Sequence, residues 1–272
     1  MVTIAATSVS RVGPLLRDWR QRRRMSQLEL ALEAGVSTRH LSFVETGRSR
    51  PSADMVMHLA ERLDVPLRER NELLLAAGFA PRYSAWSLDD PALREVREAV
   101  SRVLAAHEPY PALAVDRYWN LVASNEALGP FLEGVAPQLL VPPVNTIRLA
   151  LHPGGVAPRI LNLGEYRHDL IERLERAARL TGDPELADLH EEMLGYPGPE
   201  PPPSAPGPAV ALGLRLAPPP GSRGPELSFF STITTFGTAV DVTVSELALE
   251  AFFPADAQTA EFLRRPEPPG SS

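Results

Sequence analysis

The sequence contains no cysteine and no lysine, and it has no long apolar stretch. The lack of cysteine excludes disulfides, thiolate metal sites and a cysteine nucleophile. No apolar run approaches the roughly 20 residues that a membrane helix needs, and the first residues lack the basic segment of a signal peptide. We therefore expect a cytoplasmic protein that does not enter a membrane. Arginine supplies all 27 basic side chains, which fits GC-rich coding better than a binding signature.

The charge of the chain is unevenly distributed along its 272 residues, a length that suits one large or two ordinary domains. Residues 11–50 carry nine arginines and four acidic residues, whereas residues 81–272 carry 15 arginines and 25 acidic residues. A basic start on a chain of net charge -7 is typical of a small nucleic-acid-binding module joined to another domain. Charge alone is equally compatible with a solvated helix face.

Residues 1–80 carry the apolar spacing and capping signals of a domain of five helices. The first helix is expected over 12–24, with Val12, Leu16 and Trp19 on its apolar stripe. Ser26 and Glu29 form a capping box that opens the second helix. The inward side chains of the second helix are expected to be Leu28, Ala31 and Leu32. The remaining helices are expected at 37–47, from Ser52 onward, and at 67–77.

The second and third helices flank a Gly-Val turn, which is the helix-turn-helix signature. On a helical wheel of the third helix, Leu41, Val44 and Ser37 lie toward the core. The opposite side carries an arginine, hydroxyls and an aromatic ring: Arg39, Ser42, Phe43 and Thr46, with Thr38 at its edge. Arginine can bind guanine O6 and N7, and an apolar edge can meet a thymine methyl. This face is therefore predicted to enter the major groove of double-stranded DNA.

These motifs carry a resemblance to a known family. The run Ser26-Gln27-Leu28-Glu29-Leu30-Ala31 to Ser37, together with residues 41–42, 45–48 and 51–52, resembles the XRE family of bacterial and phage repressors. The resemblance covers about residues 12–78 and implies that the third helix reads the bases. The positions that match base-contacting residues are Thr38, Arg39 and Phe43, supported by Gln27. Phe43 departs from the polar residue often seen there, so it either touches a thymine methyl or shelters the stem of Arg39.

Two arginines beyond the third helix, Arg48 and Arg50, are placed to contact phosphates. The alternatives are that they are ordinary loop charges and that Gln27 is only a helix-start residue. The complete predicted set of DNA-binding residues is Gln27, Ser37, Thr38, Arg39, Ser42, Phe43, Arg48 and Arg50.

The rest of the chain is expected to hold a connection at 81–109, an α+β domain at 110–265 and a flexible tail at 266–272. The connection contains a helix after Asp90-Pro91, a candidate bridge or dimer element, with an apolar stripe of Leu93, Val96, Val100, Val103 and Leu104. The α+β domain is expected to begin with a hairpin at 112–116 and 120–124, followed by helices at 125–132, 145–151, 164–180 and 184–194. A proline-rich loop is expected at 197–208. Three strands are expected after it, at 210–216, 227–236 and 239–253, the last with a bulge near Ser245-Glu246. Helices between strands predict one antiparallel sheet whose apolar face they cover.

A sheet covered by helices often leaves an apolar pocket. Its predicted lining, unless these residues are simply core, is Trp119, Phe131, Leu149, Phe229, Ile233 and Val242. The segments 115–122, 125–127, 145–153 and 246–256 are similar to the ligand-binding domain of MmyB-like regulators, over about residues 90–265. This resemblance implies a PAS-like fold and a fatty-acyl or similar small apolar ligand; no cofactor or metal is expected.

Together these patterns predict a ligand-responsive transcription regulator that binds DNA as a homodimer, with half-sites about 34 Å apart. One alternative is a constitutive regulator whose second domain serves only dimerisation or a protein partner. A more distant one is an enzyme with a DNA-binding appendage. Of its candidate histidines, His152, His168 and His190 form no HExxH motif or catalytic triad pattern, and Walker and GxGxxG loops are absent from the sequence. Catalysis is therefore not expected.

Overall fold

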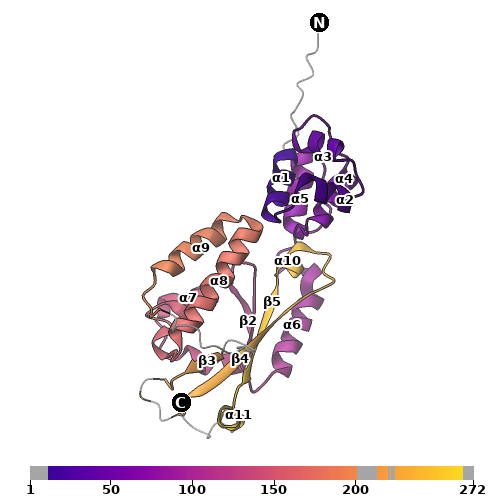
Figure 1. The fold of residues 1–272 in the computed structure, drawn as a ribbon. Coiled ribbons are helices and arrows are strands. Elements are labelled where there is room, and N and C mark those ends of the chain that lie inside the picture. The colour runs from indigo at the N-terminus through magenta and orange to yellow at the C-terminus, as the bar shows by residue number, and fades with distance from the viewer. Residues whose placement is uncertain (1–11, 201–212, 220, 222–223, 266–272) are drawn as a thin grey trace. The chain divides into compact units, whose positions relative to one another are not determined.

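The computed structural model of the chain describes residues 12–200, 213–219, 221 and 224–265 (Figure 1). These residues form two compact units. The first is built from the chain up to Trp86 together with Ala239–Val242, and the second from Ser87–Thr238 and the chain from Thr243 onward. The predicted tail at 266–272 and most of the proline-rich loop, 201–208, lie outside the described residues. None of the described helices is both long and apolar enough to cross a membrane.

The first unit contains the five predicted helices, with ends close to those expected. Their bounds are α1 Val12–Arg22, α2 Gln27–Glu33, α3 Thr38–Glu45, α4 Ala53–Arg62 and α5 Leu67–Ala77. The predicted stripe of Val12, Leu16 and Trp19 is buried in the core. The capping box between Ser26 and Glu29 is present at the start of α2. Serine hydroxyls also cap α3 and α4, so the order of caps in the sequence sets where these helices begin.

The expected inward residues of α2 are correct for Ala31 and wrong for Leu28 and Leu32. Leu28 and Leu32 are 57% and 73% exposed, and the buried residues of the helix are Leu30 and Ala31. The helix is only seven residues long. In two turns, two neighbouring stripes carry similar apolar content, and only the packing against the other helices selects between them.

The second unit is built on one antiparallel sheet with the strand order β2-β1-β5-β4-β3. The strands are β1 Ala112–Val115, β2 Leu121–Ser124, β3 Gly213–Leu216, β4 Leu227–Thr235 and β5 Ala248–Pro254. The longer helices are α6 Arg94–Ala106, α7 Thr146–Leu151, α8 Leu163–Thr181, α9 Pro184–Gly195 and α11 Ala257–Arg264. 3-10 helices occupy Pro91–Leu93, Glu126–Leu132, Pro137–Leu140 and Ala157–Arg159. The expected fold class, a helical N-terminal region followed by an antiparallel α+β domain, is confirmed.

Both faces of the interior strand β1 are covered. Its alternate residues Ala112 and Ala114 pack with Val100 and Leu104 of α6 on one face. The other residues, including Leu113, contribute to a core on the opposite face, the side on which α7, α8 and α9 lie (Figure 1). The predicted α6 stripe is correct except for Val103, which is 57% exposed. The helix after Asp90-Pro91 is therefore a layer of the second unit.

The predicted strand over 239–253 is wrong in its first part. Residues Val242–Ser245 form the short helix α10, and β5 begins only at Ala248. The apparent bulge near Ser245-Glu246 is the end of this helical turn. Alternation over four residues suited a strand, but the β5 register begins where Ala248 pairs with Val115 and Thr235. The final helix α11 was not anticipated.

Candidate functional site: a polar helix face and an apolar pocket

Helix α3 presents its predicted polar face away from the core of the first unit. Leu41 and Val44 are buried, while Thr38 and Arg39 are exposed on the opposite side. Ser37 is exposed rather than turned to the core, because its hydroxyl accepts a hydrogen bond from His40 N at 3.1 Å as the helix cap. Its structural role is therefore to fix the start of α3, where the side chains predicted to contact DNA begin.

Phe43 organises the two arginines nearest to it on this face. The guanidinium carbon of Arg39 lies 5.3 Å from the centre of the Phe43 ring, and that of Arg48 lies 6.0 Å from the same centre. Cations at this distance from an aromatic ring are attracted to it. Of the two alternatives for Phe43, contact with Arg39 is present in the structure. The aromatic ring thus restricts two planar hydrogen-bond donors before any DNA is bound.

A buried ion pair fixes α3 to the two helices before it. Arg20 of α1 donates to both carboxylate oxygens of Glu45, at 2.7 and 2.9 Å. Gln27 of α2 donates to the same carboxylate at 2.8 Å. Burial acts to raise the pKa of Glu45, but the hydrogen bonds from Arg20 and Gln27 outweigh it, so the pKa is below its usual value. Local sequence patterns do not predict this network, because its residues are up to 25 positions apart.

The remaining predicted DNA-binding residues differ in their local contacts. Ser42 is half-buried, and its carbonyl accepts a hydrogen bond from the Thr46 hydroxyl at 2.7 Å. Arg50 is exposed, and its guanidinium lies close to Gly78, the left-handed residue that ends α5. Gln27 also takes part in the Glu45 network, so it is more than a helix-start residue. DNA contact by each of these side chains stays a prediction.

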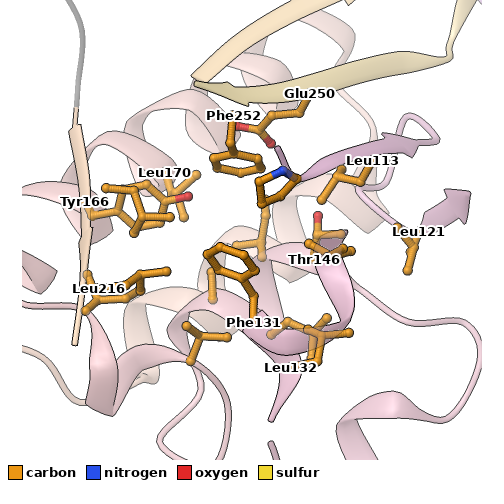
Figure 2. Close-up of a pocket in the computed structure, with 18 of the residues that line it drawn as sticks. Leu113, Leu121, Phe131, Leu132, Thr146, Tyr166, Leu170, Leu216, Glu250 and Phe252 are labelled. Carbon is orange, nitrogen blue, oxygen red and sulfur yellow. The ribbon is translucent and has the colours of Figure 1, made fainter. Parts of the chain in front are cut away.

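The second unit contains a cavity of about 100 Å³ between the sheet and its helices (Figure 2). Its lining comes from β1, β2, β3, β5, α7, α8, the 3-10 helix at Glu126–Leu132 and the loops beside them. Of the 19 lining residues, Thr146, Tyr166 and Glu250 are polar, and the indole N–H of Trp119 is the one further side-chain donor. A concave, mostly apolar site with a few polar groups is the usual form of a small-molecule pocket.

The predicted pocket residues fall into two groups. Trp119, Phe131 and Leu149 line the cavity, whereas Phe229, Ile233 and Val242 are not part of its lining. Phe229 lies in the core, with its ring centre 5.4 Å from that of Phe131. Ile233 is opposite Glu250 in the sheet register but is 42% exposed. Val242 belongs to the first unit, where its N–H donates to Ser84 O.

Glu250 is the least expected of the lining residues. It is on β5 opposite Leu113 of β1, so the antiparallel register places both side chains on the pocket face. Burial raises the pKa of this carboxyl above its usual value, and a hydrogen bond from the Ser231 side chain only partly opposes that shift. No sequence motif predicts Glu250 as a pocket residue, because a single glutamate in an apolar strand indicates a site only when its neighbours in space are known.

A buried arginine holds one wall of the pocket in place. Arg159 donates to the carbonyl oxygens of Phe131 at 3.1 Å and Ala217 at 3.3 Å. Burial lowers the pKa of its guanidinium, although Glu133 opposes the shift. Arg159 therefore ties the segment that carries Phe131 to the segment that follows β3.

Comparison with known proteins places this geometry in a family. Residues 96–265, which include the whole sheet and the pocket, match the MmyB-like transcription regulator ligand binding domain. The chain belongs to this family. Residues 16–70 of this MmyB-like regulator match the helix-turn-helix family. The two matches together describe a DNA-binding transcription regulator with a ligand-binding domain, as both resemblances implied.

The same assignment is supported by two curated relatives, described as uncharacterized HTH-type transcriptional regulators of Mycobacterium tuberculosis, strains CDC 1551 / Oshkosh and ATCC 25618 / H37Rv. Each is 30% identical to the MmyB-like regulator over 115 residues, which is 42% of this chain and 74% of the relative. The family and these relatives point to transcription regulation rather than catalysis. Within the described residues, no cluster of three or more histidine, aspartate or glutamate side chains could hold a metal ion.

Proposed function

We propose that this regulator is controlled by a small apolar molecule, in the class of fatty-acyl compounds, that binds in the pocket of the second unit and changes the affinity of the first unit for its operator. The observation that carries the proposal is the nearly apolar cavity within the residues that match a ligand-binding domain. A ligand that binds one conformation of this domain more tightly shifts the population toward it. Linkage then requires that ligand and DNA affect each other's affinity equally.

The test of ligand control begins with mass spectrometry of an organic extract from the natively purified protein. The extracted compound is then titrated against operator binding by fluorescence anisotropy. Ala150 lines the pocket, so Ala150→Trp should fill the cavity and abolish the response to the compound. Ala105→Trp, on an exposed position of α6, is the matched control and should keep the response. A compound that binds saturably but leaves DNA affinity unchanged would support a constitutive regulator instead.

DNA contact is proposed for the polar face of α3 and the arginines beyond it, in a homodimer that binds a pseudo-palindrome in the cytoplasm. We expect Arg39→Ala to weaken specific sites by about 1–3 kcal/mol because Arg39 reads a base. Arg48→Ala should weaken binding to all duplexes and make the salt dependence shallower. The exposed Arg94 of the second unit provides the control substitution to alanine. Equal loss on specific and random duplexes would contradict base reading by Arg39.

The homodimer is proposed because a single helix-turn-helix domain reads few base pairs, and two are commonly needed for a specific site. Analytical ultracentrifugation of the full chain, with and without operator, checks the oligomeric state. A complex with one protein chain per operator at saturation would contradict it.

A further inference from the structure

The polar groups of the pocket come from three different elements and are surrounded by apolar side chains. Thr146 is on α7, Tyr166 is on α8 and Glu250 is on β5. Figure 2 shows the oxygen-bearing ends of these side chains among the apolar residues that line the cavity. Apart from the indole N–H of Trp119, the other 16 lining side chains carry no hydrogen-bonding group, so these three are the main places where a polar part of a ligand can be recognised.

Glu250 is the one carboxyl among the three polar side chains, so their combined charge is negative or zero. Its side chain is buried, and Ser231 supplies a hydrogen bond to it. The cation that acts on Glu250 is Arg173, but Arg173 donates to Asp169 at 2.9 Å and does not line the pocket. The neighbouring carboxylate therefore offsets part of the effect of the arginine on Glu250. An anionic ligand group in the pocket would face Glu250 without a cation in the lining to balance it.

Tyr166 and Thr146 complete the hydrogen-bonding set. No described residue hydrogen-bonds to the Tyr166 hydroxyl. Burial, aided by the charge of Glu250, raises the pKa of this hydroxyl, so that it remains a neutral donor. The Thr146 hydroxyl donates to Trp119 O at 3.1 Å, which leaves its oxygen lone pairs to accept. The pocket thus offers a donor, an acceptor and a buried carboxyl from three elements of a largely apolar lining.

We propose that the pocket selects apolar molecules that end in an uncharged group able to donate and accept hydrogen bonds, such as an alcohol or a carboxamide, and that it rejects the corresponding free carboxylate. The inference rests on the proposed ligand-binding function and specifies the chemical class of the ligand. A neutral end group can donate to Glu250 and accept from Tyr166. Beside an ionised Glu250, a carboxylate must instead take up a proton or lie unbalanced, and either requirement lowers its affinity.

The test compares ligands that share one hydrocarbon chain and differ only at the end group. Octanol, octanamide and octanoate, and the corresponding compounds of six and ten carbons, are titrated into the full-length protein at pH 7.5 by isothermal calorimetry. We expect the alcohol or amide to bind at least about tenfold more tightly than the carboxylate of the same length, a difference equivalent to one pKa unit of proton uptake. Glu250→Gln should raise carboxylate affinity and reduce that ratio to about threefold or less.

Two further variants separate recognition from folding. Glu261→Gln, on an exposed position of α11, is the matched control and should leave the ratio unchanged. Tyr166→Phe should weaken alcohol binding about three- to tenfold, the usual effect of losing one hydrogen bond. Circular dichroism of each variant checks that it is folded.

The outcomes distinguish this inference from the function on which it rests. Carboxylate binding as tight as that of the alcohol in the unmodified protein would overturn the end-group selection and leave ligand binding intact. An alcohol preference that persists in Glu250→Gln would overturn the role of Glu250. Failure of every compound at every chain length to bind would count against the proposed function itself.

Discussion

The Arg20–Glu45 pair gives the sharpest prediction for the first unit. Replacing Arg20 by methionine removes both hydrogen bonds to a carboxylate whose side chain is only 1% exposed. Loss of one member of a buried ion pair costs about 3–5 kcal/mol, because the remaining charge is buried without compensation. Gln27 still donates to Glu45, so we expect a loss near the lower end, about 3 kcal/mol.

The matched double variant Arg20→Met/Glu45→Leu removes both charges and should lie within about 1–2 kcal/mol of the unmodified protein. Hydrogen exchange of α1–α3 peptides in increasing urea, followed by mass spectrometry, measures the stability of this unit within the full chain. The reasoning is refuted if the single variant loses less than about 1 kcal/mol, or if the double variant is less stable than the single one.

Three further predictions concern other positions. Gly13→Ala should destabilise the first unit by about 1–3 kcal/mol in thermal unfolding, because its new Cβ would be 2.4 Å from Val44 O. Gly129→Ala, with open space around it, is the control, and equal effects of the two substitutions would contradict the close approach at Gly13. Glu250 has a raised pKa in the folded protein, so its contribution to the free energy of unfolding is fully present below about pH 4.5 and is lost as pH rises through the folded pKa. Glu250→Gln should therefore flatten the decline of second-unit stability above that pH, as measured by hydrogen exchange. A variant whose stability falls with pH in parallel with that of the unmodified protein would exclude this effect. Arg159→Met should weaken ligand binding by releasing the Phe131 segment, whereas unchanged affinity in calorimetry would show that the wall holds without it.

Local patterns predicted much of the fold because local interactions set it. Ser26, Ser37 and Ser52 cap helices where the sequence placed them, since a cap needs only the next three residues. A pattern predicted the structure less well where it was compatible with two alternative local structures. The stripe with Leu28 in α2 and the alternation before Ser245 both depended on packing that spacing does not reveal.

The pocket shows the same division between local and distant information. Trp119, Phe131 and Leu149 were predicted from their apolar character in a domain whose sheet was expected to be covered by helices, and they line the cavity. Glu250 and Tyr166 were missed, because their position follows from the register of β1 with β5 and from the packing of α8. Polar residues in an apolar pocket are few, and single-sequence patterns do not distinguish them from surface residues.

The short segment Ala239–Val242 has a consequence for how the protein is dissected. It lies between β4 and β5 in the chain, yet it belongs to the first unit, where Trp86 N donates to Asp241 at 3.3 Å and Val242 N to Ser84 O at 2.8 Å. The two units are therefore interleaved in sequence and joined by three chain crossings rather than by one linker. A protein cut after Trp86 would lose Asp241 and Val242 from the first unit. Point substitutions in the intact chain, rather than separated halves, are the appropriate way to assign roles to each unit.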